Sequence, residues 1–171
     1  QDNKGASDYW VVKINANGLK EWDASYGGIS DDWLTSLQQT TDGGYILGGW
    51  SFSGISGDKT QATKGENDYW IVKIDANGVK QWDADFGGSS NDYLTPLQQT
   101  ADGGYILSGY SSSPISGDKT QAGPGGTDYW MVKTDVNGIK QWDATFGGSD
   151  FEFLFKAVLI FVVSFNELTE T

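Results

Sequence analysis

The sequence predicts an all-β protein, and three observations lead to this fold class. A stretch of sixteen residues recurs nearly unchanged, as DYWVVKINANGLKEWD at 8–23, DYWIVKIDANGVKQWD at 68–83 and DYWMVKTDVNGIKQWD at 128–143. Apolar side chains within each copy alternate with a period of two, which is the period of a β-strand. Glycine is abundant (24 residues) and proline is rare (3 residues), as suits tight turns between short strands, and no segment has a helical period.

The first strand of the repeated stretch should be covered on both sides. In DYWIVKID (68–75), Trp70 and Val72 point to one face, whereas Tyr69 and Ile71 point to the other. Because both faces carry apolar side chains, neither face is expected to meet water.

Turn signals divide the rest of the sixty-residue unit into three more strands. Asn77-Gly78 predicts a type I′ hairpin, after which VKQWDADF is the return strand. DYLTPLQQT at 92–100 and GYILSGYS at 104–111 form a second hairpin across ADGG, and 112–127 is a long loop. The unit is therefore four antiparallel strands.

Four-stranded units that stack face to face are the blades of a β-propeller, so the predicted architecture is a β-propeller-like array of four-stranded antiparallel blades. In propeller order the chain opens with an outer pair of strands at 8–26. Complete blades follow at 33–86 and 93–146, and an inner-pair position follows at 151–171. The whole chain is interpreted as one repeat domain (1–171), with copies at about 8–67, 68–127 and 128–150 and a divergent apolar segment at 151–171.

The last segment raises the question of how the array is completed. It could pair with the first strands to complete a third blade, but closed propellers typically have 4–8 blades. Three alternatives remain open. The chain could be an arc that pairs with a second copy, which would make a homo-oligomer. It could also be a fragment of a longer chain, or the last segment could act as a plug at the end of the array. The apolar run AVLIFVV at 157–163 is the length of a strand and too short to span a bilayer.

The motifs of the repeated unit carry two resemblances to known protein families. KIDANGVKQW resembles the blade repeat of quinoprotein-dehydrogenase-like propellers, with Asp75, Gly78, Lys80 and Trp82 at the matching positions, although Val79 separates the glycine from the lysine. The whole unit, with DYW, DANG, QWD, FGG, LQQT, DGGYIL and SGDKT, resembles the repeats of large secreted or surface proteins of Bacteroidota, many of which carry a type IX secretion sorting domain. This second resemblance implies an exported protein that is extracellular or attached to the cell surface.

Composition argues against several function classes. The chain has no His, no Cys and no Arg, so the usual general base, thiol nucleophile and bidentate phosphate ligand are missing. A net charge of −12 would repel a polyanion, so we expect no nucleic-acid partner. We therefore expect a non-enzymatic protein without a membrane span. The further alternative is a fragment of a quinoprotein-dehydrogenase-like enzyme.

The candidate ligand-binding residues lie on the rim that the predicted topology builds from two kinds of loop. SGDKT at 56–60 and at 116–120 should lie beside SDD at 30–32 and SND at 90–92, close to Trp50 and Tyr110. Aromatic rings beside acidic and hydroxyl groups can bind a sugar, whereas the competing interpretation packs the rings between blades and leaves the loops solvated. The candidates are Trp50, Tyr110, Asp58, Lys59, Thr60, Asp118, Lys119 and Thr120.

Other chemistry has weaker support. Calcium could bind hard oxygen ligands such as Asp31 with Asp32, Asp83 with Asp85, or Asp58, but their spacing fits no EF-hand loop and not all of them recur. Paired carboxylates could act as a glycosidase acid and base, yet nearly all pairs repeat with the unit, as structural residues do. No cofactor, no metal site and no catalytic residue is therefore assigned.

The sequence thus favours a non-enzymatic extracellular or cell-surface binding scaffold that presents equivalent loops for multivalent adhesion. A glycan-binding, lectin-like propeller is the alternative. In either case the partner would be a glycan or another surface ligand.

Overall fold

The computed structural model describes residues 4–151, and all regular structure in this range is β-strand. Residues 4–151 contain no helix, and thus none that is long and apolar enough to cross a membrane. The strands are β1 (Tyr9–Ile14), β2 (Lys20–Tyr26), β3 (Asp32–Gln39), β4 (Tyr45–Ser51), β5 (Asp68–Ile74), β6 (Lys80–Phe86), β7 (Asp92–Gln99), β8 (Tyr105–Ser111), β9 (Asp128–Thr134) and β10 (Lys140–Phe146). The predicted all-β class is confirmed.

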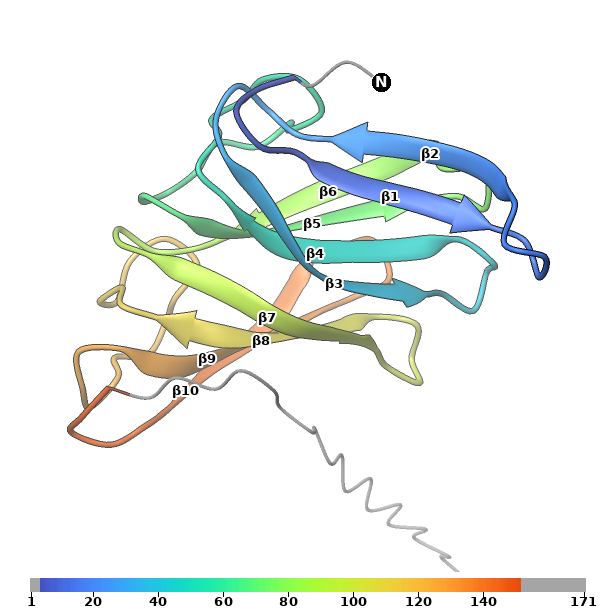
Figure 1. Cartoon of the computed structure of the whole chain (residues 1–171). Helices are drawn as coiled ribbons and strands as arrows, with labels where there is room; N and C mark the ends of the chain where they lie inside the picture. The colour runs from blue at the N-terminus through green and yellow to red at the C-terminus, as the bar shows by residue number, and fades with distance from the viewer. Residues whose placement is uncertain (1–3, 152–171) are drawn as a thin grey trace, which may run out of the picture.

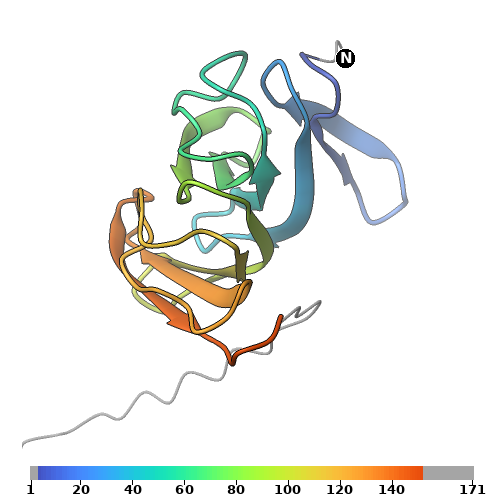
Figure 2. The same cartoon turned by 90° about the vertical axis from the view of Figure 1, so that its left-hand side faces the viewer.

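The strands form three antiparallel sheets that stack as successive layers (Figures 1 and 2). We call β1–β2 the first sheet, β3–β6 the second sheet and β7–β10 the third sheet. Within the second and third sheets the strands follow one another in chain order. The predicted grouping, a two-stranded start followed by two units of four strands, is confirmed. The predicted inner-pair position at 151–171 lies outside the described residues except for Phe151, which forms a single bridge to Thr127.

The apolar cores lie between the sheets. Every residue of β5 is buried, because the second sheet is covered on one face by the first sheet and on the other by the third. This confirms the prediction that the strand at 68–75 is covered on both sides. The core between the first and second sheets contains Tyr9, Val11, Ala24, Tyr26, Leu47, Trp70, Val72 and Ile74. The core between the second and third contains Ile46, Tyr69, Ile71, Ala84, Phe86, Leu94, Leu97, Tyr105, Leu107, Trp130 and Val132.

The repeated Trp-Asp pair has a structural role. Trp82 packs edge-on against Tyr105 of the next sheet, with ring centroids 5.9 Å apart. Asp83 accepts hydrogen bonds from Trp70 Nε1 (3.0 Å) and from the N–H of Thr60 (2.9 Å). The tryptophan thus joins two sheets, and the aspartate fixes a long loop to its own sheet.

The hairpin at 75–79 differs from the type I′ turn that the sequence predicts. Gly78 has a positive φ of 81°, but Asn77 does not, whereas a type I′ turn needs positive φ at both central residues. Asp75 explains the difference, because its Oδ1 accepts the N–H groups of both Asn77 and Val79 at 2.8 Å. The side chain holds a longer turn in which the glycine alone is left-handed, and Gly18 and Gly138 show the same conformation.

Candidate functional site

The two SGDKT loops are fixed against the end of the preceding sheet. In the first loop, the N–H of Asp58 donates to the carbonyl of Gly27 (2.8 Å), and Ser56 Oγ accepts the N–H of Ile29 (3.0 Å). The loop at 116–120 repeats both hydrogen bonds, each at 2.8 Å. Each loop therefore lies beside the segment that carries the SDD or SND motif, as the sequence predicts.

Lys59 lies inside the protein and does not face solvent. Its ammonium group forms an ion pair with Asp85, and neither side chain has any exposed area. The same amine lies 5.6 Å from the ring centroid of Trp70, where the face of the ring attracts a cation. This placement favours a structural role for Lys59 over contact with a surface ligand.

Lys119 occupies the equivalent position in the third sheet but has a different environment. Thr145 stands where Asp85 stands one repeat earlier, and among residues 4–151 no carboxylate forms an ion pair with Lys119. Its amine donates to Ser111 Oγ (3.0 Å). Burial lowers the pKa of Lys119 from its ordinary value, because desolvation disfavours the charged amine.

The two threonines of the loops hold them in place through hydrogen bonds. Thr60 donates its hydroxyl to Asp83 Oδ1 (2.7 Å), and Thr120 donates its hydroxyl to Asp143 Oδ1 at the same distance. Both backbone N–H groups donate to the other oxygen of the same carboxylate, at 2.9 Å. Each SGDKT loop is thereby tied to the last strand of its own sheet.

Asp58 and Asp118 are the partly exposed acids of these loops. Their side chains keep about a quarter of their area accessible (23% and 24%), so they are the loop carboxylates that an external ligand could reach. Each carboxylate already has a lysine partner from an equivalent segment one repeat earlier: Lys4, before β1, pairs with Asp58, and Lys64, before β5, pairs with Asp118 at 3.0 Å. A ligand would have to compete with these ion pairs.

Trp50 and Tyr110 belong to a continuous row of four aromatic rings, which we call the aromatic row. Trp33 stacks on Trp50 with centroids 5.6 Å apart and an interplanar angle of 18°. Trp50 meets Tyr93 of the third sheet edge-on at 5.2 Å, and Tyr93 contacts Tyr110 at 5.1 Å. The row crosses from the second sheet to the third, and Trp33 is 51% exposed at its end.

Hydrogen-bonding groups lie beside the aromatic row. Asn67 donates through Nδ2 to Asn91 Oδ1 (2.5 Å) and to the hydroxyl of Tyr93 (3.2 Å). Asn91 in turn donates to Glu66 Oε2 (2.6 Å). The row therefore combines ring faces with amide and carboxylate groups on one rim.

Only half of the aromatic row is among the predicted site residues: Trp50 and Tyr110 are, whereas Trp33 and Tyr93 are not. The cross-strand register supplies the missing signal, because Trp33 pairs with Trp50 and Tyr93 pairs with Tyr110 in the two inner hairpins. Directly opposed residues on adjacent strands point to the same face, so each pair presents two adjacent rings.

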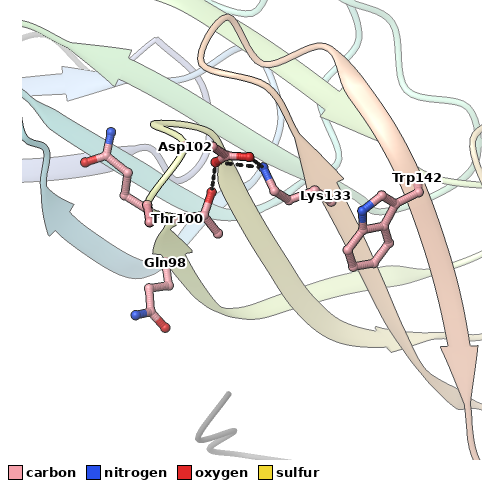
Figure 3. A pocket seen from close by; sticks show the side chains of 7 residues that line it. Gln98, Thr100, Asp102, Lys133 and Trp142 are labelled. Carbon is pink, nitrogen blue, oxygen red and sulfur yellow. Dashed lines mark hydrogen bonds and ion pairs between the residues drawn. The ribbon is translucent and has the colours of Figure 1, made fainter. Parts of the chain in front are cut away.

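A cavity of about 450 Å³ opens on the outer face of the third sheet (Figure 3). An ion pair between Lys133 and Asp102 (3.0 Å) lies on one side of it, and the indole of Trp142 lies on the other. It is lined by Gln98, Gln99, Thr100, Ala101, Asp102, Lys133 and Trp142. None of these residues is among the ligand-binding residues that the sequence predicts.

The carboxylates considered for calcium are spread over different contacts. Asp32 accepts the hydroxyl of Ser53 (3.0 Å), and Asp83 and Asp85 bind the threonine and lysine groups described above. In the part of the chain that the structure describes, no three His, Cys, Asp or Glu side chains come together as a set that could hold a metal ion.

Asp68 should make stability depend on pH. Burial, followed by the nearby charge of Asp85, raises the pKa of Asp68 from 3.8 to about 7. The folded state thus holds a proton at Asp68 that the unfolded chain releases, so this contribution to stability is complete below about pH 4 and is lost as the pH rises to about 7. We expect Asp68→Asn to raise the free energy of unfolding by about 1–2 kcal/mol at pH 8 and to have little effect at pH 4, because one pKa unit is worth about 1.4 kcal/mol and relaxation reduces the full value.

Urea denaturation at both pH values measures this difference. Asp102→Asn is the matched control of opposite sign, because a hydrogen bond from Thr100, followed by one from Lys133, lowers the pKa of Asp102 to about 2. That substitution should be mildly destabilising at pH 8. An Asp68→Asn effect that is equal at pH 4 and pH 8 would contradict the raised pKa.

A comparison with known protein families found no family model that matches the chain, and a search of curated protein sequences found no match either.

Proposed function

We propose that the chain is a β-propeller-like array that acts as a non-enzymatic binding scaffold, in an extracellular or cell-surface location. The observation that carries this proposal is the aromatic row, which equivalent strand positions of two successive sheets build as one continuous surface. Large, rigid rings provide contact area at a low cost in conformational entropy.

The structural contacts of the repeated polar residues support a scaffold in preference to an enzyme. Lys59, Thr60 and Thr120 hold loops to sheets, and they recur at the same place in each unit. Residues that repeat in this way suit a protein that presents equivalent surfaces. Weak equivalent contacts gain affinity through avidity without any new interaction.

Glycan binding is the second candidate, and the groups beside the aromatic row favour it. A sugar presents an apolar face to a ring and hydroxyl groups at its edge. The stacked pair of Trp33 and Trp50 offers the ring face, and Glu66, Asn67 and Asn91 offer hydrogen-bonding groups on the same rim.

Replacing Trp50 or Tyr110 with alanine tests both candidates. If the aromatic row binds a glycan, each substitution should weaken binding at least tenfold, a loss of about 1.4 kcal/mol, with little change in the urea midpoint. Affinity electrophoresis in gels containing xylan, β-glucan or mannan identifies a polysaccharide that retards the protein, and fluorescence titration then gives the affinity. Phe52→Ala is the matched control, because Phe52 directly follows β4, is 51% exposed and lies outside the row.

The scaffold proposal itself is tested on a surface. Beads coated with the full chain should adhere to mucin-coated glass, and the Trp50→Ala and Tyr110→Ala variants should adhere less than Phe52→Ala. If the two row variants are only less stable and both adhesion and gel retardation stay unchanged, the row is internal packing and both proposals for it are wrong.

A further inference from the structure

The contact between neighbouring sheets is built twice from the same groups. Tyr9 Oη donates to the carbonyl of Trp70 (2.9 Å), with ring centroids 4.8 Å apart. One sheet later, Tyr69 Oη donates to the carbonyl of Trp130 (3.0 Å), with centroids 4.9 Å apart. Each contact therefore has a donating face, which carries the tyrosine, and a receiving face, which carries the tryptophan.

A second tryptophan completes the contact at a turn. Trp22 donates through Nε1 to the carbonyl of Ala76 (3.1 Å), and its ring covers Gly78, where an added Cβ would lie 3.1 Å away from it. Trp82 covers Gly138 in the same way, at 2.7 Å. The glycine of each hairpin thus provides room for a tryptophan of the preceding sheet.

The third sheet ends in a donating face that is unmatched in the part of the chain that the structure describes. Trp142, the third copy of Trp22 and Trp82, is 44% exposed. Phe146 is 55% exposed, whereas its counterparts Tyr26 and Phe86 are each 4% exposed. We call this surface the tail face.

The cavity beside Trp142 belongs to the same face. One repeat earlier, the equivalent groups bind β7 of the next sheet. The N–H of Thr41 donates to Gln99 Oε1 (2.9 Å), and Gln38 Oε1 accepts the N–H of Gln99 (2.7 Å). The cavity on the third sheet (Figure 3) thus lies at the position where, one sheet earlier, the following sheet binds.

The first sheet begins with an unmatched receiving face. Trp10 is 64% exposed, whereas Trp70 and Trp130 at the same position are fully buried. Ile14 is 60% exposed, whereas Ile74 is buried. No atom of the described residues lies within 4 Å of a Cβ added at Gly18, the position that a tryptophan covers in the other two hairpins. We call this surface the head face.

We propose that the head face of a second copy of this chain binds the tail face of the first and forms a third contact of the type that the chain builds twice. The two faces have the shape and chemistry of a contact already present in the molecule, which identifies the partner as the same repeat. The contact is head-to-tail, so it uses two different surfaces and leaves one of each free on the resulting dimer.

Two blocked variants test the proposal with the full chain. Trp10→Lys with Ile14→Lys blocks the head, and Trp142→Lys with Phe146→Lys blocks the tail; all four residues are exposed, so folding should be retained. In light scattering, each blocked variant on its own should have the monomer mass of 18.5 kDa. The wild type should have a larger mass. An equimolar mixture of the two variants should give a dimer, because the mixture restores one free head and one free tail.

The control is Ile55→Lys with Ile115→Lys, which changes two exposed isoleucines in the loops away from both faces and should associate like the wild type. Two results would overturn the proposal. One is a wild-type mass of 18.5 kDa together with a mixture that stays monomeric. The other is a blocked variant that associates on its own, since this would place the contact on a different part of the chain.

Discussion

Lys59→Met should lower the free energy of unfolding by about 3–5 kcal/mol at pH 7. The substitution removes the cation from the fully buried pair with Asp85 and leaves that carboxylate with Lys64 alone, at 3.2 Å. Removal of one partner from a buried ion pair is strongly destabilising, and Lys64, which is partly exposed and also pairs with Asp118, compensates the desolvated carboxylate only in part. Urea denaturation of the full chain measures the loss.

The chain contains a matched control for this change. Lys119→Met makes the same substitution at the equivalent position, where Thr145 replaces the carboxylate. Burial already disfavours the charged form of Lys119, so its replacement by an apolar side chain of similar length should change stability by less than about 1 kcal/mol or increase it. Equal losses for the two variants would show that the lysines contribute through packing and not through charge.

Gly49→Ala should destabilise the protein by about 3 kcal/mol, the upper end of the range for overpacking. A Cβ at this position would lie 1.8 Å from the carbonyl oxygen of Trp33 and 2.8 Å from the hydroxyl of Tyr9. The first atom belongs to the paired backbone of β3 and the second to the contact with the first sheet, so neither can move without loss of hydrogen bonding. Thermal denaturation by circular dichroism measures the effect.

Gly54→Ala is the control for Gly49→Ala, because an added Cβ at Gly54 meets no atom within 4 Å and its φ is not in the left-handed region. It should be nearly neutral. Gly109→Ala should behave like Gly49→Ala, since its Cβ would lie 2.0 Å from the carbonyl oxygen of Tyr93. A neutral Gly49→Ala variant would mean that β3 and β4 can separate at this point without cost.

Much of the fold could be predicted because the sequence repeats the two strands of the sixteen-residue stretch three times and the other two strands of the unit twice. The strand order, the grouping into sheets and the two-sided cover of β5 all follow from alternation and turn signals. The turn type could not be predicted from Asn77 and Gly78 alone. The Asp75 side chain takes two backbone N–H groups and thereby selects a turn in which Asn77 keeps an ordinary conformation.

The candidate site was predicted less completely than the fold, because the sequence shows neither which charged side chains are buried nor which residues face each other on adjacent strands. Lys59 stands in a polar loop, where the sequence gives no sign of burial, because its partner Asp85 is 26 residues away in another strand. Trp50 and Tyr110 could be selected by their place near a strand end. Their neighbours Trp33 and Tyr93 required the cross-strand register, which the period of the sequence alone does not define.

The donating and receiving faces also determine how the chain can change in length. Within residues 4–151, neighbouring sheets of the stack pack through the Tyr–Trp and Trp–Gly contacts that recur sixty residues apart. A duplication or deletion of one whole unit would therefore join a donating face to a receiving face at the new junction and require no compensating substitution. Such an architecture tolerates unequal recombination between its own repeats, so that the number of units can vary among descendants while every internal junction stays the same.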